Sequence, residues 1–253
     1  MPRNWHHSGM KIFFLTVLLT AMAAALPQAN EKLRQFLDAV RKGDLAAVRS
    51  ALEGDPGLVN ARGDDGVPAV RLALYYRQPE MAKLLLGGGP TLDLHDAAAA
   101  GQTARLRQLL AAHPEQVNQL SADGATALGL AAFFSNRDTV ELLLNSGAQI
   151  NRTATNPAFP FAALHSAMSA GHRDIVDLLL ARGADVNVRE GGGLTVLHEA
   201  AGLGNLEYIK LLLAKGANPR AKTDAGKLPE DFARERSFSE AAGILERAAA
   251  GKK

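Results

Sequence analysis

The sequence predicts an all-α repeat solenoid, in which helix-turn-helix units stack one on another and hairpin fingers join them. Three features recur in the same order along the chain: an alanine-rich segment, a run of leucines and a Gly-Ala pair. The glycines of the clearest pairs, Gly147, Gly183 and Gly216, lie 36 and then 33 residues apart. Self-similarity at a period of this size is the sequence signature of a repeat architecture.

Each element of a unit follows from its residues. The alanine-rich segment predicts the first helix, because small side chains let the helices of neighbouring units approach closely. These segments are Leu128 to Ala132, Leu164 to Ala167 and Leu197 to Ala201. The leucine run predicts the second helix: from Asp174 to Leu180, apolar residues at i, i+3 and i+4 form one apolar stripe. The glycine that follows, such as Gly183, suits the positive φ that closes a last helical turn.

These residues resemble the ankyrin repeat family, whose unit of about 33 residues is a turn followed by two helices with a T-P-L-H-x-A signature. The match is close at Gly193 to Ala201, and it recurs at Gly124 to Leu128, Ala163 to Ala167 and Gly171 to Val176. The resemblance implies that the His of each Leu-His pair joins the turn to the helix start by hydrogen bonds. That structural role falls to His95, His165 and His198, and the helix-ending role to Gly147, Gly183 and Gly216.

The repeat domain is expected to cover residues 30–250 as about seven units. The expected boundaries are near 30–62, 63–92, 93–120, 121–153, 154–189, 190–222 and 223–250, of which the first and last are caps. A stack of at least about three units is stable, so we expect this domain to fold alone.

Departures from the repeat pattern predict local differences. The third unit lacks its leading turn, because residues 87–91 run almost directly into Leu94, so its finger should be short or missing. The fifth unit is longer, with an enlarged finger expected at 152–160. Arg77 and Ser135 stand where the family prefers Gly between its helices, so the chain should turn there at some backbone cost. The third unit is predicted to be the weakest.

A secretory signal peptide is expected at residues 1–25. The segment from Ile12 to Leu26 carries no charge. It is too short for a membrane-spanning helix, which needs about 20 residues, and its length is typical of the apolar region of a signal peptide. Lys11 supplies the positive flank, and cleavage after Ala25 is one option. Met10 is an alternative start. The other interpretation is an uncleaved anchor; in both cases the domain is exported, with the periplasm of a bacterium expected and secretion or membrane anchoring left open.

Composition and motifs exclude several functions. The chain has no cysteine, which removes disulfides, thiol catalysis and zinc ribbons. Beyond the leader, acidic and basic residues balance, and aromatic residues are only 5%, so no nucleic-acid face is indicated. His198-Glu199 lacks the second His of a zinc-protease helix, and the glycine runs lack the remainder of a phosphate loop. We therefore expect no enzyme activity, no metal and no cofactor.

The concave face of the stack and its fingers are the expected partner-binding surface. The concave candidates follow the alanines of the first helices: Tyr75, Tyr76, Phe133, Phe134, Ser169 and Leu203. The finger candidates are Asp65, Asp123, Arg152, Arg189 and Glu190. Exposed aromatic residues are frequent anchors of protein interfaces. The alternatives are that one ring of each pair covers the core, and that the finger aspartates only form turns.

The sequence thus predicts an exported, non-catalytic and monomeric protein that binds another protein, of a kind the sequence does not identify. One alternative is a secreted effector or inhibitor that binds a foreign or toxic protein. Another is a structural spacer. A hidden small-ligand site would require a pocket with converging polar groups, which uniform repeat packing disfavours.

Overall fold

The computed structural model describes residues 31–156 and 160–251. The predicted signal peptide and three residues of the predicted enlarged finger, 157–159, lie outside these residues. The chain divides into two compact bodies at Ala148 and Gln149, which are described separately. We refer to the described residues up to Ala148 as the N-terminal body and to those from Gln149 as the C-terminal body.

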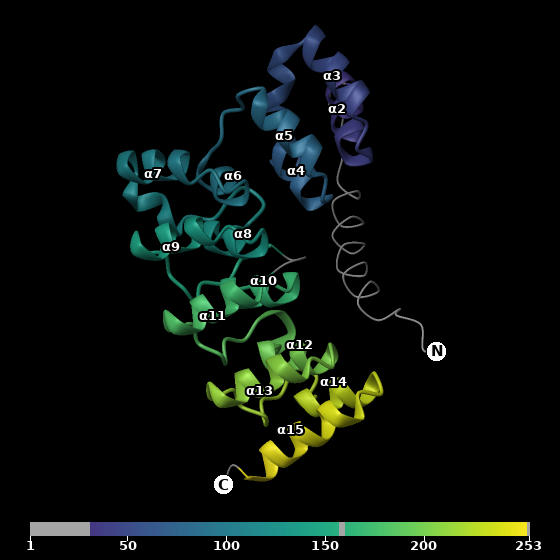
Figure 1. The fold of residues 1–253 in the computed structure, drawn as a ribbon, viewed down its shortest axis with the longest axis vertical. Coiled ribbons are helices and arrows are strands. Elements are labelled where there is room, and N and C mark those ends of the chain that lie inside the picture. Colours follow the sequence, from purple (N-terminus) through teal and green to yellow (C-terminus); the bar gives the residue numbers. More distant parts are fainter. Residues whose placement is uncertain (1–30, 157–159, 252–253) are drawn as a thin grey trace. The chain divides into compact units, whose positions relative to one another are not determined.

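The N-terminal body consists of antiparallel helix pairs that follow one another along the chain (Figure 1). The pairs are α2 (Glu31–Lys42) with α3 (Leu45–Gly54), α4 (Ala69–Tyr75) with α5 (Pro79–Gly87), α6 (Leu94–Ala99) with α7 (Thr103–Ala112), and α8 (Ala127–Phe133) with α9 (Arg137–Asn145). Short 3-10 helices, η1 (Pro56–Asn60) and η2 (Pro114–Asn118), follow α3 and α7. Each begins with a proline, which cannot continue the preceding α-helix.

The C-terminal body repeats the same arrangement. Its pairs are α10 (Ala163–Ala170) with α11 (Arg173–Ala181), α12 (Val196–Gly202) with α13 (Leu206–Ala214), and α14 (Pro229–Glu235) with α15 (Ser239–Gly251), and η3 (Gly191–Gly193) forms a finger tip. No β-strand occurs among the described residues, although isolated β-bridges close two fingers, between Arg62 and Pro68 and between Leu120 and Thr126. The all-α prediction is confirmed.

The core explains why the sequence alternates alanines and leucines. Alanines of the first helices are fully buried, as are leucines of the second helices: Ala97, Ala131, Ala167 and Ala200, and Leu85, Leu143, Leu179 and Leu212. Burial of one leucine side chain contributes about 1.5–3 kcal/mol, so the leucine stripes supply much of the stability of each pair.

Positive φ angles occur where the sequence predicts them. Gly147, Gly183 and Gly216 follow the second helices with φ of 88°, 88° and 90°. Arg77 and Ser135 turn the chain between paired helices with φ of 55° and 62°, in the region that costs a side chain conformational energy. Both predictions are confirmed.

The finger of the third repeat is indeed short. Helix α5 ends at Gly87 and α6 begins at Leu94, and residues 88–93 form no hairpin. The side-chain oxygen of Asn60 accepts a hydrogen bond of 2.7 Å from the amide of Thr91, which holds this connection against the preceding repeat. None of the helices formed by the described residues is long and apolar enough to cross a membrane.

Candidate partner-binding surface

Aromatic rings from two repeats meet in the N-terminal body. The ring of Tyr75, at the end of α4, lies 5.3 Å from the ring of Phe134 and 6.4 Å from that of Phe133, measured between centroids. Phe133 and Phe134 themselves are 5.1 Å apart, edge to face. All three residues are partly exposed, although burial raises the pKa of the Tyr75 hydroxyl, which points inward. We call these three residues the aromatic cluster.

The cluster forms across the third repeat, because that repeat contributes only small residues there. Helix α6 carries alanines between α4 and α8, and Ala99 is 1% exposed. Because the side chains of α6 at this position are only methyl groups, the ring of Tyr75 can reach Phe133 and Phe134 at the end of α8. The finger tips also touch: a Cβ added to Gly66 would lie 2.9 Å from the Cβ of Ala122, in the finger of the fourth repeat.

A buried ionic network accompanies this contact. Arg71 of α4 is 1% exposed and donates a hydrogen bond of 3.0 Å to Asp123 in the finger of the fourth repeat. Its Nε lies 3.7 Å from Asp96, which is fully buried and accepts a bond of 2.5 Å from Arg62. Burial raises the pKa of the Asp96 carboxyl, although Arg71 and Arg62 oppose the shift.

Arg71 occupies the position at which other repeats carry His. His95 and His198 there contact carbonyl oxygens of the following finger, at 2.9 Å to Gln119 and 3.3 Å to Lys227. The repeat after Arg71 has no finger, and the longer arginine side chain instead spans to the finger beyond it. Sequence reasoning missed Arg71 and Asp96, although an arginine at the His position just ahead of the missing finger was a usable signal.

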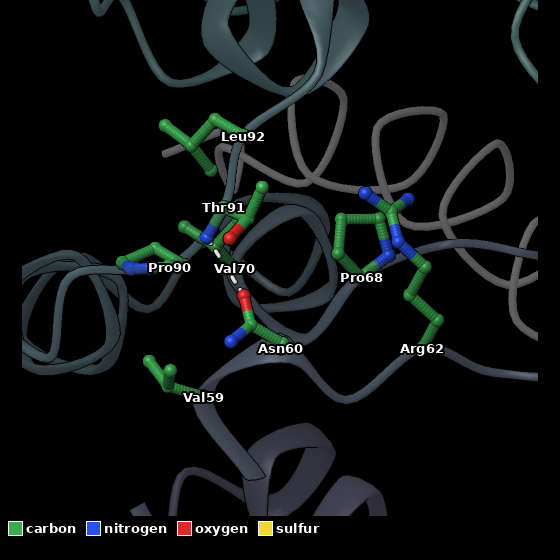
Figure 2. Close-up of a pocket in the computed structure, with 8 residues that line it drawn as sticks. All are labelled: Val59, Asn60, Arg62, Pro68, Val70, Pro90, Thr91 and Leu92. Carbon is green, nitrogen blue, oxygen red and sulfur yellow. Dashed lines mark hydrogen bonds between the residues drawn. The ribbon is translucent and has the colours of Figure 1, made fainter. Parts of the chain in front are cut away.

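A pocket of about 240 Å³ lies beside the shortened connection (Figure 2). It is lined by Val59, Asn60, Arg62, Pro68, Val70, Pro90, Thr91 and Leu92. Small-molecule sites usually enclose about 300–1,000 Å³. Its arginine is already engaged with Asp96 and Asp93, so the pocket has the character of a packing defect left by the missing finger.

Comparison with known proteins agrees with this architecture. A family model described as "Ankyrin repeats (3 copies)" matches residues 94–190 and 155–223, which together cover just over half of the chain. The chain belongs to the ankyrin repeat family. Ankyrin repeats generally mediate protein–protein interaction and are typically non-catalytic.

Two curated proteins are similar to parts of the chain. Ankyrin repeat and SAM domain-containing protein 6 of Rattus norvegicus is 33% identical over 140 residues, which is 54% of this chain and 13% of that protein. Cortactin-binding protein 2 of Ornithorhynchus anatinus is 44% identical over 66 residues, 26% of this chain and 4% of that protein. The chain therefore spans only a small part of the length of these relatives.

The remaining concave candidates of this ankyrin chain are not members of the aromatic cluster. Tyr76 is partly exposed, and Arg41 and Asp38 of α2 act on its pKa, which burial raises. In the C-terminal body, the Ser169 hydroxyl donates to Glu199 of α12, and Leu203 is partly exposed. Burial raises the pKa of Glu199 to about 7, opposed by the hydrogen bond from Ser169.

The finger candidates divide into outward and buried residues. Asp65 is exposed and accepts from the amide of Val67, Arg152 is partly exposed, and the Arg189 side chain is 52% exposed and pairs with Asp224. The side chains of the finger candidates Asp123 and Glu190 are only 8% and 1% exposed, so they offer little surface to a partner. Asp123 accepts a hydrogen bond from the buried Arg71, and Glu190 accepts one from the amide of Ala162 at the start of α10.

The ankyrin histidines are all buried, but only one has the expected bonds. His198 accepts from the Thr195 amide at 3.1 Å, which joins the turn to α12. His95 contacts Gln119 in the next repeat, and His165 lies beside Glu190. Within residues 31–156 and 160–251, no group of three or more His, Asp or Glu side chains is placed to hold a metal ion.

Proposed function

We propose that this ankyrin-repeat chain is a non-catalytic module that binds a partner protein through the aromatic cluster, with Tyr76, Ser169, Leu203 and the outward finger residues Asp65, Arg152 and Arg189 as further contacts. We also infer that all the helix pairs from α2 to α15 are ankyrin units, seven in number and including the caps. The proposal takes the chain as a monomer without cofactor, nucleic-acid or enzymatic function.

The aromatic cluster is the observation that carries this proposal. Only 5% of the residues are aromatic, yet three partly exposed rings gather at one place. Aromatic side chains at the centre of a surface are the residues that most often dominate binding energy in protein interfaces.

The cluster rests on a rigid base. The Arg71–Asp123 hydrogen bond and the contact between the fingers fix α4 against the fourth repeat. A surface that is ordered before binding loses less conformational entropy when a partner docks. This pre-organisation supports binding rather than a passive spacer role.

Export is a second part of the proposal. Its support is the uncharged segment from Ile12 to Leu26, with Lys11 before it and small residues at Ala23 and Ala25. Fractionation of the natural host followed by N-terminal sequencing tests it. A periplasmic form beginning at Leu26 supports a cleaved leader, a cleaved form in the medium favours the secreted effector or inhibitor, and an intact cytoplasmic form contradicts export.

Crosslinking, capture and mass spectrometry in the natural host test the binding surface. The variant carries Ala at Tyr75, Tyr76, Phe133 and Phe134, and circular dichroism verifies that it remains helical. The matched control is Phe238→Ala, which removes a partly exposed ring from the turn between α14 and α15. We expect the partner to be lost in the first variant and retained in the second.

A partner that both variants retain would move binding to the fingers. If no form of the protein captures a partner, and the natural host functions equally well with either variant as with the natural chain, the proposal is contradicted. That result would favour a structural spacer.

A further inference from the structure

A buried acid–base pair joins two elements of the C-terminal body. The Nδ1 atom of His165, in α10, lies 2.6 Å from Oε1 of Glu190, in the finger that precedes α12. Their side chains are 4% and 1% exposed. The same Glu190 oxygen accepts a hydrogen bond of 2.6 Å from the amide of Ala162, at the start of α10.

In two other fingers, the residue at the position equivalent to Glu190 accepts a hydrogen bond from within its own finger. Ser121 accepts from the amide of Ala125 at 2.9 Å, and Thr223 accepts from the amide of Lys227 at 3.1 Å. Glu190 is longer and acidic, and it crosses instead to the preceding repeat. The finger itself is still closed by the hydrogen bond from the Glu190 amide to the Leu194 carbonyl, at 2.9 Å.

The surroundings of the pair disfavour any net charge. The Phe161 ring stacks on the His165 ring, at 6.2 Å between centroids and 13° between planes. His165 Nδ1 and Nε2 and Glu190 Oε2 are buried without a hydrogen-bond partner among the described residues, so the approach of Nδ1 to Oε1 is a close contact and not a hydrogen bond. Since a lone charge without compensation is costly in such a site, the favoured state of the pair is neutral, with Glu190 protonated and His165 uncharged.

The charged groups around the pair strengthen this preference. From α12, His198 disfavours a positive charge on His165, and Glu199 disfavours a negative charge on Glu190. In the finger, Arg189 turns outward and donates to Asp224 and to the Lys222 carbonyl. Burial lowers the pKa of His165 to about 3 and raises the pKa of Glu190 to about 9.

We propose that the His165–Glu190 pair is a pH-sensitive latch, which holds the finger of residues 189–194 against the start of α10 at mildly acidic pH and releases it as the pH rises. Its effect on binding rests on the proposed function, in which this finger contacts a partner. Release exposes the Glu190 carboxylate beside Arg189, so the open finger offers an acidic group that the closed finger hides.

The pH range follows from counting protons. The closed pair holds one proton between about pH 3 and pH 9, whereas the opened groups titrate at the ordinary values of 4.5 and 6.5. Between pH 4.5 and 6.5 both forms hold one proton, so opening does not depend on pH. Above pH 6.5 the open form loses its proton, and the opening constant rises about tenfold per pH unit toward pH 9.

Hydrogen exchange of the full chain, read by NMR as protection factors at pH 5.5 and 8.5, tests the latch. We expect the protection of the Glu190 and Ala162 amides to fall about a hundredfold across this range. The reference is the Thr223 amide, which closes the equivalent finger by a 2.9 Å bond to Lys227 and should lose far less protection. Glu190→Gln should abolish the fall, and Glu207→Gln, on an exposed face of α13, should preserve it.

An equal change at Glu190 and Thr223, or a fall that persists in Glu190→Gln, would overturn the latch. If Glu190→Gln does not fold, carbon-13 titration of the natural chain decides. A Glu190 carboxyl that stays protonated to near pH 9, beside a His165 that stays uncharged down to acidic pH, supports the neutral closed pair, whereas titrations near 4.5 and 6.5 contradict it. These measurements need no partner, so their failure and the failure of partner capture are separate results.

Discussion

At the scale of single residues, the most consequential side chain is Arg71. It replaces the family's His, and its length lets it join Asp96 and Asp123 across a repeat that has no finger. An arginine that is 1% exposed must have partners, because an isolated buried charge is strongly unfavourable. Its Nε and Nη1 atoms lack hydrogen bonds among the described residues, so the network depends on charge as much as on hydrogen-bond geometry.

Replacement of Arg71 by Met should destabilise the N-terminal body by about 3–5 kcal/mol, since it removes the buried positive charge that faces the Asp96 and Asp123 carboxylates. Because burial already raises the pKa of Asp96, this deficit should grow as the pH rises through that raised pKa and shrink in acid. Hydrogen exchange of α4 and α8 measures it. Arg34→Met, which removes an exposed arginine paired with Glu31, should cost under about 0.5 kcal/mol; an equal loss would contradict a buried network.

Glu199 gives a separate pH dependence in the C-terminal body. Its folded pKa of about 7 exceeds the ordinary 4.5, so the folded state keeps a proton that the unfolded state releases, and stability falls as the pH rises between 4.5 and 7. The loss should total roughly 1–3 kcal/mol. Urea unfolding of Glu199→Gln at several pH values should show a flatter profile; an unchanged slope would contradict the assignment.

At the scale of elements, the missing finger organises the N-terminal body. With only residues 88–93 between α5 and α6, the fingers before α4 and α8 touch at Gly66 and Ala122. The same shortening lets the aromatic rings of α4 and α8 meet over the alanines of α6.

Substitutions at two glycines can separate the effect of the contact between fingers from the effect of backbone strain. Gly66→Ala places a side chain at φ +76° and against Ala122, whereas Gly226→Ala does so at φ +79° with nothing within 4 Å. Both changes carry the backbone cost of about 1–2 kcal/mol, and only the first carries the clash. We expect Gly66→Ala to be the more destabilising and to weaken protection in α4 and α8. Equal effects would show that the fingers do not press on each other.

The third helix pair, α6 and α7, is predicted to open first. Its finger is missing, and its first helix offers mainly alanine methyl groups to its neighbours. Hydrogen exchange should give lower opening free energies for α6 and α7 than for α10 to α13. Equal protection in all these helices would mean that the Arg71 network fully compensates for the missing finger.

The sequence predicts the helices and turns of each repeat well, but it predicts only some of the places where this chain departs from the regular repeat. Leucine stripes, helix-ending glycines and the missing finger all follow from local rules, so the helices and the turns at Arg77 and Ser135 were predictable. The buried positions of Asp123 and Glu190 were not, because finger residues usually face water and only the partners Arg71 and His165 draw these inward. Contact between Tyr75 and Phe134 was also beyond local rules, since it depends on what the repeat between them lacks.

At the scale of the whole molecule, each body has its own character. The N-terminal body holds the aromatic cluster on a network of buried charges, and the C-terminal body holds the buried acid–base pair and Glu199. In repeat proteins, stability is approximately a sum over repeats and their interfaces. The effects of Arg71→Met and Glu199→Gln should therefore add within about 0.5 kcal/mol, which unfolding of the double variant measures; a larger deviation from additivity would show that the two sites are energetically coupled.

The most direct test of the proposed binding surface places a photoreactive phenylalanine analogue at Phe134, and separately at Phe238, in the natural host. Both probes retain an aromatic ring, so they disturb the packing of the protein less than alanine substitutions do. We expect irradiation to attach one partner protein to the probe at Phe134 and not to the probe at Phe238. Attachment at Phe238 alone, or equally at both positions, would contradict the assignment of binding to the aromatic cluster.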